Sequence, residues 1–211
     1  MNAIDEMTPD NVTAVILAGG EGRRMAGADK GLVELDGKPL IEHVIARLQP
    51  QVSNLIISAN RNVAHYQKYG YPVITDQINH QGPLGGILSA LQQCNNDWLL
   101  TLPCDTPYPP QDLCLRICQA ASQTPNLLFT AHDGQRSQPL FSMIHCSLIR
   151  SLQTFLASNE KKVILWLKQA GAIDVEFSDQ PMAFININTK EMLANIQKKH
   201  HDCQHKGLFK A

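Results

Sequence analysis

The sequence predicts an α/β protein in which a mostly parallel sheet is covered by helices on both faces. Apolar, strand-like runs alternate with segments of helical periodicity along most of the chain, which is the pattern of such sheets. A length of 211 residues with 44% hydrophobic content is enough to bury a core of this kind. We therefore expect one domain over residues 12–198, preceded by an extension at 1–11 and followed by a poorly ordered tail at 199–211.

In the first half of the chain, glycine and proline mark where the elements begin and end. Pro39 suits the first turn of a helix with one apolar face, and Gly82 followed by Pro83 suits the start of another. The expected elements are a buried strand at 12–17, a helix at 40–48, strands within 54–60 and 71–76, a helix at 83–94 and a buried strand within 97–105.

The second half is expected to interrupt the parallel pattern with a hairpin. Asp133 and Gly134 lie between two apolar runs, which is typical of a hairpin turn and predicts an antiparallel excursion. The expected elements are a helix starting at Pro109 and Pro110 and carrying Leu113, Ile117 and Ala121, the hairpin within 126–144, helices at 147–157 and 161–170, strands at 173–177 and 183–188, and a last helix from Asn188 or Thr189.

Composition excludes several classes of protein. A formal net charge of −1 at pH 7 argues against a protein that works by neutralising the phosphates of a nucleic acid. The first residues, MNAIDEMTPDN, lack the apolar centre of a secretory signal, and no apolar stretch approaches the length of a membrane span. We expect a cytoplasmic protein that binds neither nucleic acid nor membrane.

The cysteines show no disulfide framework. The six are scattered through apolar segments, and we interpret most as buried thiols. Cys114 and Cys118 lie four residues apart on an expected helix, where a core face is favoured over a shared metal. The tail residues His200, His201, Cys203 and His205 have the composition of a metal site, but a solvated terminus is the favoured interpretation.

A loop rich in glycine and cations follows the first expected strand. It does not fit G-x-x-x-x-G-K-[ST], because Lys30 is followed by Gly31, and it does not fit G-x-G-x-x-G, whose third glycine would be Met25. The loop contains Gly19, Gly20 and Gly22, whose backbone N–H groups can approach an anion, and the cations Arg23, Arg24 and Lys30. The cations favour binding of a triphosphate; a strand-to-helix turn with solvated cations stays the alternative.

Asp105 is the candidate metal ligand. It ends a buried strand, and open α/β sheets bind ligands at that edge. Transfer of a nucleotidyl group builds charge on the α-phosphate and the departing pyrophosphate, which Mg²⁺ can bridge. In the alternative interpretation, Asp105 initiates the turn before Thr106 and Pro107.

Five segments of the chain together resemble those of the molybdenum cofactor guanylyltransferases. The residues that carry the resemblance are LAGGEGRRMAGADKGLVELDGKPL, ISANRN, DQINHQGPLGGILSAL, LPCDTPY and AFININT, in register from about residue 12 to residue 196. The resemblance implies a Rossmann-like, three-layer nucleotide-diphosphosugar-transferase-like fold. It also implies Mg²⁺-dependent transfer of GMP from GTP to the molybdenum-molybdopterin cofactor, which gives the guanine dinucleotide form and pyrophosphate.

The resemblance also assigns site residues. Leu17, Ala18 and Gly19 match the guanosine-binding stretch, with Gly20 beside them, while Lys30 matches the lysine that contacts phosphate. Asp76 matches a nucleotide-contacting acid, although a turn or cap role fits it equally from the residues alone, and Asp105 matches the magnesium ligand. We expect Arg24 and Lys30 to offset charge that develops during transfer. The sequence departs from the family pattern at Ser58, where an asparagine is expected.

Other polar residues are assigned less specifically. Asn186 and Asn188 are candidates to contact the acceptor or the metal, but Asn188 with Glu191 fits a helix cap equally well. Lys161 and Lys162 begin an expected helix, where cations are disfavoured, which suggests an anionic partner; a solvated pair is the alternative.

Two other functions remain open from the sequence. A related cytidylyltransferase or sugar-phosphate nucleotidyltransferase would share the glycine loop, and a cofactor carrier would show little turnover. Because the acceptor's phosphate is already ionised near pH 7, transfer needs no strong general base. We also expect transient contact with proteins of cofactor synthesis and of molybdoenzyme maturation.

Overall fold

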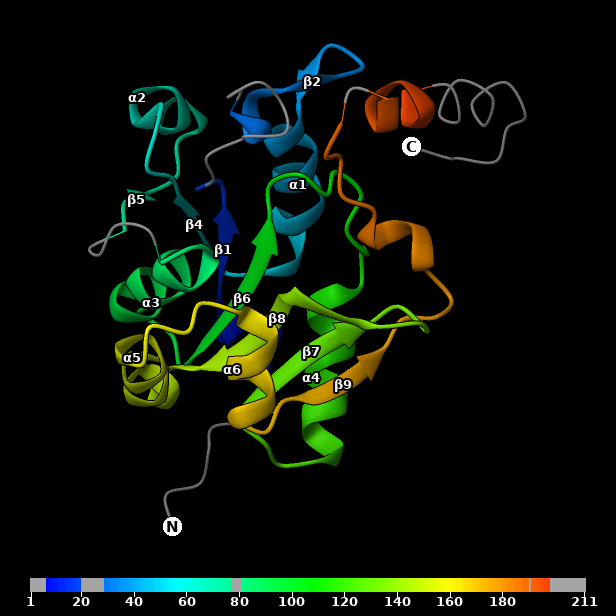
Figure 1. The fold of residues 1–211 in the computed structure, drawn as a ribbon. Coiled ribbons are helices and arrows are strands. Elements are labelled where there is room, and N and C mark those ends of the chain that lie inside the picture. The colour runs from blue at the N-terminus through cyan, green and yellow to red at the C-terminus, as the bar shows by residue number, and fades with distance from the viewer. Residues whose placement is uncertain (1–6, 20–28, 77–80, 190, 198–211) are drawn as a thin grey trace.

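The computed structural model describes residues 7–19, 29–76, 81–189 and 191–197, and the structural statements below concern these residues. A seven-stranded sheet runs in the order β5-β4-β1-β6-β8-β7-β9 (Figure 1). Its strands are β1 (Val12–Leu17), β4 (Asn54–Ser58), β5 (Val73–Ile74), β6 (Trp98–Pro103), β7 (Leu128–His132), β8 (Ser137–His145) and β9 (Ile173–Glu176). A small antiparallel ribbon pairs β2 (Glu34–Leu35) with β3 (Lys38–Pro39).

The strand directions confirm the predicted sheet. β5, β4, β1 and β6 are neighbours and parallel. β8 pairs antiparallel with both β6 and β7, and β9 then returns parallel to β7. The predicted hairpin is therefore the antiparallel excursion, and it turns between Asp133 and Arg136, where the Asp133 amide donates to the Arg136 carbonyl at 3.1 Å.

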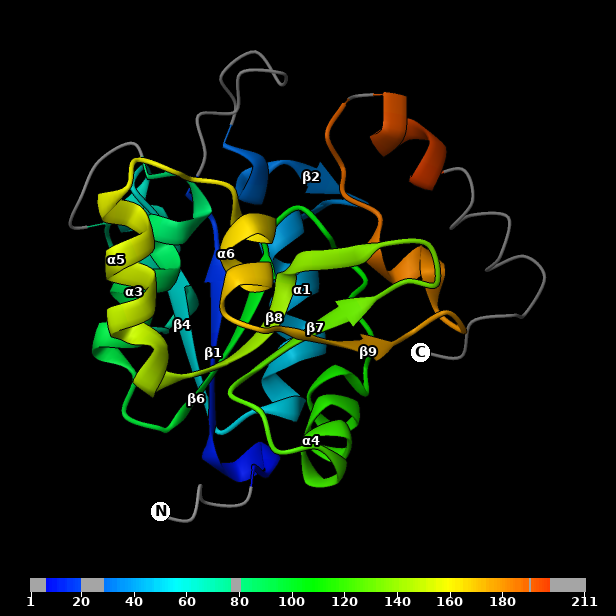
Figure 2. The same cartoon turned by 60° about the horizontal axis from the view of Figure 1, so that its bottom comes forward.

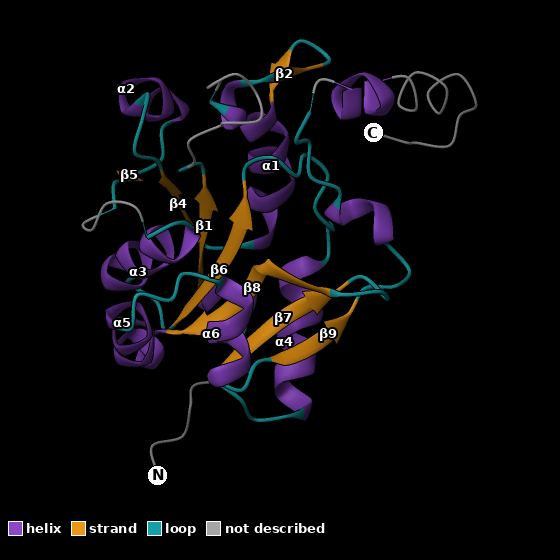
Figure 3. Ribbon diagram, viewed as in Figure 1, coloured by secondary structure: helices purple, strands orange, loops and turns teal. Residues whose placement is uncertain are grey.

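Helices cover both faces of the sheet, which gives three layers (Figures 2 and 3). β1 shows why, because Val12, Ala14 and Ile16 point into one core cluster and Val15 and Leu17 into the other. The first cluster is closed by α1 (Leu40–Leu48) and α4 (Leu113–Gln123), and the second by α3 (Pro83–Gln93), α5 (Ile149–Ala157) and α6 (Val163–Gln169). A short helix, α2 (Val63–Tyr66), follows β4.

Two sequence predictions are wrong in detail. Residues 183–188 form no strand, because Pro181–Phe184 is a 3₁₀-helix and the segment after it bonds to the loop beyond β6. The Pro109–Pro110 pair does not open α4, which begins at Leu113. Pro110 instead offers its carbonyl to the Gln51 side-chain amide at 2.9 Å, which ties this loop to the end of α1.

A last helix follows near Asn188 and Thr189, as predicted. Residues 191–197 are helical, and Thr189 caps them, because its Oγ1 accepts from the Met192 amide at 3.1 Å. Cys114 and Cys118 are buried on the core face of α4, as predicted. Residues 1–6 and the tail from 198 onward, with His200, His201, Cys203 and His205, lie outside the described residues.

None of the described helices combines the length and the apolar character that a membrane span requires.

Candidate functional site

Four polar or glycine residues lie side by side at the carboxyl edge of the parallel strands. Asp76, Asn60, Gly19 and Asp105 each come two residues after the end of β5, β4, β1 and β6, respectively. Backbone hydrogen bonds extend the ladder past the strand ends, from Ala18 N to Ser58 O at 2.8 Å and from Cys104 N to Leu17 O at 3.2 Å. The sheet register therefore brings together residues that are separated by up to 86 positions in the chain (from 19 to 105).

Lys30 and Asp105 form the centre of the site. Lys30 lies in a short 3₁₀-helix (Lys30–Leu32), and its Nζ donates to Asp105 Oδ2 at 2.8 Å. The same Nζ also contacts Asn188 Oδ1. The Lys30 side chain is 28% exposed and the Asp105 side chain 10%, so this ion pair is shielded from much of the solvent. The lysine and acid that the sequence placed in one site do meet.

The second carboxylate oxygen of Asp105 meets the requirement of a metal ligand. Oδ1 is buried and makes no hydrogen bond with a described residue, and a buried charged oxygen without a partner costs free energy. Asp105 does not start the following turn with its side chain, since its one hydrogen-bonded oxygen contacts Lys30. Within the described ranges no three His, Cys, Asp or Glu side chains cluster. Mg²⁺ commonly takes one or two carboxylates and completes its shell with water and phosphate.

The late segment of the chain closes over this centre. Ile187 is buried beside Leu35 and Leu40, and its amide donates to the Asp105 carbonyl at 2.7 Å. Thr106 Oγ1 donates to Asn186 Oδ1 at 2.7 Å. Asn186 and Asn188 thus lie on the two sides of the Ile187 residue that bonds to Asp105, and Asn188 contacts Lys30 instead of capping the last helix.

A clamp that sequence analysis missed fixes the residue before Lys30. Tyr66 hydroxyl donates to Asp29 Oδ1 at 2.5 Å, and Asn62 Nδ2 donates to Asp29 Oδ2 at 3.0 Å. Tyr66 is fully buried, and its pKa is raised, chiefly by that burial. Both oxygens of Asp29 are held by the segment after β4, so Lys30 is positioned from outside its own loop.

We expect Tyr66→Phe to lower kcat roughly tenfold, because Lys30 would no longer be held at the reacting centre. Loss of one hydrogen bond should lower the free energy of unfolding by about 1 kcal/mol. Tyr71→Phe is the matched control, since its hydroxyl lies outside this set of hydrogen bonds. A Tyr66→Phe enzyme with wild-type kcat would show that the clamp serves folding only.

Asp76 and Asn60 form a closed pair. The Asp76 amide donates to Asn60 Oδ1 at 2.8 Å, and Asn60 Nδ2 donates to Asp76 Oδ2 at 2.9 Å. Asp76 Oδ1 is buried without a hydrogen-bond partner among the described residues. Burial raises the pKa of Asp76, and the bond from Asn60 opposes part of that rise. Neither side-chain oxygen of Asp76 caps a turn or helix within the described residues.

The first turn of α3 packs tightly against this pair. Gly82, at the helix start, has a φ of +61°. A Cβ on Gly85 would lie 2.9 Å from Asp76 Oδ2, and one on Gly86 would lie 2.6 Å from Ser58 Oγ. Ser58 is therefore buried under the helix, and the side-chain amide beside Asp76 comes from Asn60.

Gly86→Ala should lower the free energy of unfolding by about 1–3 kcal/mol, because the new methyl group would overpack the contact with Ser58. The double variant Gly86→Ala/Ser58→Ala should recover part of that loss, since it removes the hydroxyl that the methyl meets. Urea unfolding of the wild type, both single variants and the double variant measures the coupling. Additive effects in this cycle would contradict the predicted contact.

The remaining predicted residues divide into three groups. Leu17 and Ala18 are buried at the end of β1, and the Ala18 amide is already bonded to the sheet, while Gly19 is exposed beside Asn60. Gly20, Gly22, Arg23 and Arg24 lie outside the described residues. Lys162 lies at the start of α6, where Glu160 Oε1 accepts the Lys161 and Lys162 amides.

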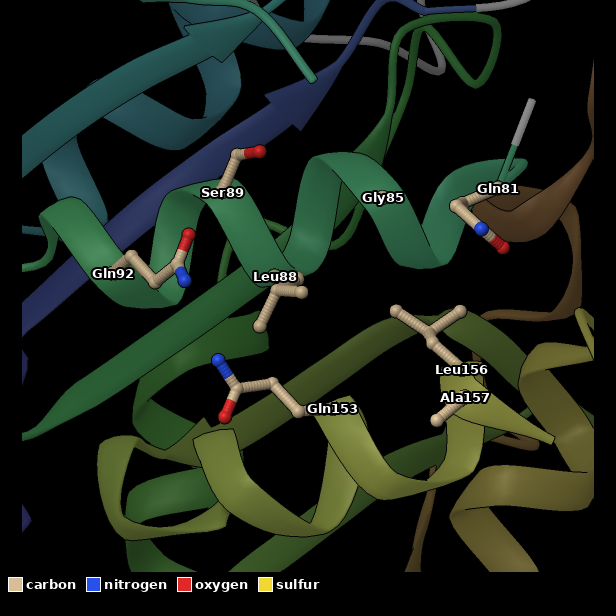
Figure 4. Close-up of a pocket in the computed structure, with 8 residues that line it drawn as sticks. All are labelled: Gln81, Gly85, Leu88, Ser89, Gln92, Gln153, Leu156 and Ala157. Carbon is tan, nitrogen blue, oxygen red and sulfur yellow. The ribbon is translucent and has the colours of Figure 1, made fainter. Parts of the chain in front are cut away.

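Two cavities adjoin the site. One of about 410 Å³ lies between α3 and α5, where Leu88 faces Leu156 and the polar groups are uncharged, such as Gln92 and Gln153 (Figure 4). The other, of about 700 Å³, lies next to Asn186 and the end of β6 and includes three cations in its wall. Of the two, only the second is suited to an anionic ligand.

Comparison with known proteins shows the family to which this sequence is similar. Residues 14–171 match the family described as a MobA-like NTP transferase domain. A molybdenum cofactor guanylyltransferase of Photobacterium profundum is 47% identical over 180 residues, covering 85% of this chain and 92% of that protein. One of Vibrio cholerae is 43% identical over 195 residues, covering 92% and 95%.

Solved structures share the fold. Molybdopterin-guanine dinucleotide biosynthesis protein A from Archaeoglobus fulgidus superposes with a TM-score of 0.76 at 20% identity, covering 90% of this chain and 99% of that chain. The 4-diphosphocytidyl-2C-methyl-D-erythritol synthase from Anaerococcus prevotii gives a TM-score of 0.70 at 12% identity, covering 94% and 100%. At these identities the likeness concerns the fold alone.

Proposed function

Because the chain belongs to the molybdenum cofactor guanylyltransferases, nucleotidyltransferases of molybdenum cofactor biosynthesis, we propose that it transfers GMP from GTP to the molybdopterin form of the cofactor. The products are the guanine dinucleotide cofactor and pyrophosphate. The observation that carries this proposal is the Lys30–Asp105 pair at the carboxyl edge of β1 and β6. It places a cation and a partly unsatisfied carboxylate where an open sheet binds its ligand.

The triphosphate would bind against Lys30. The Nζ of Lys30 already donates to an oxygen of Asp105 and to one of Asn188. Phosphate oxygens are hydrogen-bond acceptors too, and their negative charge strengthens such a bond. Lys30 would hold the triphosphate and stabilise the charge that develops on pyrophosphate as it leaves. Arg24, Gly19 and Gly20 belong to the same proposed cradle by their place after β1.

Asp105 would hold Mg²⁺ through the oxygen that has no partner, and Asn186 or Asn188 offers a neutral oxygen beside it. When bound, Mg²⁺ supplies charge neutralisation at the phosphate oxygens. The acceptor's phosphate oxygen attacks the α-phosphorus in line, the bond to the β-phosphate oxygen breaks, and pyrophosphate departs. The protein's task is to position and neutralise, because the nucleophile is already ionised.

The guanine base would bind at Asp76 and Asn60. Guanine presents N–H donors on its Watson–Crick edge, and the unpartnered Asp76 Oδ1 is an acceptor. Asn60 holds the carboxylate in place through both of its side-chain atoms. The deep placement of Ser58 under Gly86 makes Asn60 the amide that supports base recognition here.

This base assignment predicts how GTP binding depends on pH. Asp76 accepts guanine N–H groups most strongly when it is ionised, and burial raises its pKa. As the pH is lowered from neutral, the affinity for GTP should therefore begin to fall at a higher pH than it would for an ordinary aspartate. Asp76→Asn should bind GTP about tenfold more weakly at neutral pH and lose this component of the pH dependence.

Calorimetric titration of GTP at a series of pH values from neutral downwards measures both effects. Protonation of GTP itself contributes equally to wild type and variant, so the difference between their slopes isolates Asp76. Asp112→Asn is the control, because Asp112 bonds to Arg116 at the start of α4. Parallel slopes for wild type and Asp76→Asn would contradict the placement of the base.

The function itself is tested with a panel of nucleotides. The enzyme, Mg²⁺ and the molybdopterin cofactor are incubated with GTP, CTP, ATP or UTP, and pyrophosphate and dinucleotide product are measured. We expect turnover with GTP well above the others. A preference for CTP would refute the base assignment, and binding of finished cofactor without any pyrophosphate release would indicate a carrier.

A further inference from the structure

Two cysteine side chains meet at the end of β6 opposite to Asp105. Cys94 is the C-cap of α3, and Cys146 follows β8 and begins the turn that leads into α5. The Cys146 amide donates to the Asp97 carbonyl at 2.8 Å, which extends the pairing of β6 with β8. The strand register therefore brings together two thiols that lie 52 positions apart in the chain (from 94 to 146).

The two sulfur atoms share a partner and contact each other. The Sγ of Cys94 lies 3.1 Å from the Asn96 carbonyl oxygen, and the Sγ of Cys146 lies 3.2 Å from the same oxygen. The two side chains also hydrogen-bond to each other. A disulfide needs the sulfur atoms about 2.05 Å apart. Only the difference between this length and a hydrogen-bond length has to be closed by side-chain rotation.

Both thiols are accessible, and one of them is activated. Cys94 and Cys146 are partly exposed. The hydrogen bond with Cys146 lowers the pKa of Cys94 to about 6, against the opposing effects of burial and of the Asp97 carboxylate. The same hydrogen bond, together with burial, raises the pKa of Cys146. A partly exposed thiolate is the form of cysteine that attacks disulfides. The other cysteines of the described ranges are buried, namely Cys104, Cys114 and Cys118.

We propose that Cys94 and Cys146 form a reversible disulfide, with the disulfide of a small thiol such as glutathione as the oxidant. The Cys94 thiolate attacks one sulfur of the oxidant, and one small thiol leaves, which gives a mixed disulfide at Cys94. Cys146 then loses its proton to solvent and attacks the Cys94 sulfur, and the second small thiol leaves. Two cysteine thiols are thus oxidised while one small disulfide is reduced to two thiols.

The disulfide would connect α3 to the turn before α5. The two helices lie side by side, and Leu88 of α3 faces Leu156 of α5 (Figure 4). Cys94 and Asp105 lie beyond opposite ends of β6, whose six residues span about 20 Å. A cross-link of this kind restricts the unfolded chain. We therefore expect it to stabilise the fold without removing any group of the proposed nucleotide site.

Peptide mapping of the oxidised protein tests the inference. The full chain is incubated with glutathione disulfide, the remaining thiols are alkylated, and chymotryptic peptides are identified by mass spectrometry. Cleavage after Trp98 separates Cys94 from Cys104. Cys94→Ser removes the attacking thiolate, and Cys146→Ser removes the second step. Cys203→Ser is the control, because that cysteine lies outside the described residues and is not a member of the pair.

We expect wild type and Cys203→Ser to gain a Cys94–Cys146 disulfide that dithiothreitol reverses, and Cys146→Ser to keep glutathione on Cys94. Cys94→Ser should react at least about tenfold more slowly. Oxidation should raise the midpoint of thermal unfolding of wild type by about 5 °C and leave that of Cys146→Ser unchanged.

Free thiols at Cys94 and Cys146 in the oxidant-treated, folded protein would overturn the inference. So would equal reaction of the buried cysteines, glutathione left on both thiols of wild type, or a midpoint that does not rise on oxidation. None of these measurements depends on GTP or on turnover, so their outcome is independent of the proposed function.

Discussion

Replacing Asp105 by asparagine should lower kcat for nucleotidyl transfer by about 10³-fold. The substitution preserves shape but removes the charge that binds Lys30 and, through the unpartnered Oδ1, would hold Mg²⁺. Pyrophosphate release at saturating GTP and acceptor measures the effect. Because Asp105 is buried, urea unfolding of the same variant separates lost chemistry from lost folding.

Asp112→Asn is the control for this experiment. Asp112 accepts a hydrogen bond of 2.6 Å from Arg116 and lies away from the sheet edge that carries Asp105. It should retain wild-type kcat. An Asp105→Asn enzyme that keeps kcat within about tenfold of wild type would remove the carboxylate from the mechanism. A protein that delivers finished cofactor equally well with and without Asp105 would act as a carrier.

The second large effect is expected at Lys30. Lys30→Ala should lower kcat/KM for GTP, and the loss should correspond to about 1–3 kcal/mol of transition-state stabilisation, because a charge-assisted contact with the triphosphate is lost. Lys30→Arg should recover part of this loss, since it keeps the charge but not the geometry. Lys38→Ala, at an exposed position in β3, is the matched control. Unchanged kinetics in Lys30→Ala would contradict the placement of the triphosphate.

Much of the fold could be predicted because its strands alternate with helices in a regular way. β1 and β6 appear as continuous apolar runs, since both faces of a central parallel strand are buried. The hairpin was visible from Asp133 and Gly134. The segment 183–188 misled the prediction, because its apolar residues alternate like a strand although its backbone bonds to the loop that carries Asp105.

Part of the site could also be predicted from the parallel order of the strands. Lys30 and Asp105 follow strands that turned out to be neighbours, so the edge of the sheet brings them together. Sequence analysis singled out Ser58, whereas the parallel register of β4 and β5 places its neighbour Asn60 in direct contact with Asp76. No local pattern pointed to Tyr66, because its role depends on long-range packing against Asp29.

The central claim is that a nucleotide triphosphate binds between Lys30 and Asp105. A crystal structure of the protein with Mg²⁺ and a GTP analogue that cannot transfer its α-phosphate tests it most directly. We predict that Lys30 Nζ contacts the triphosphate, that Asp105 Oδ1 faces the metal and that the base meets Asp76. A triphosphate seated away from both Lys30 and Asp105 would contradict the account.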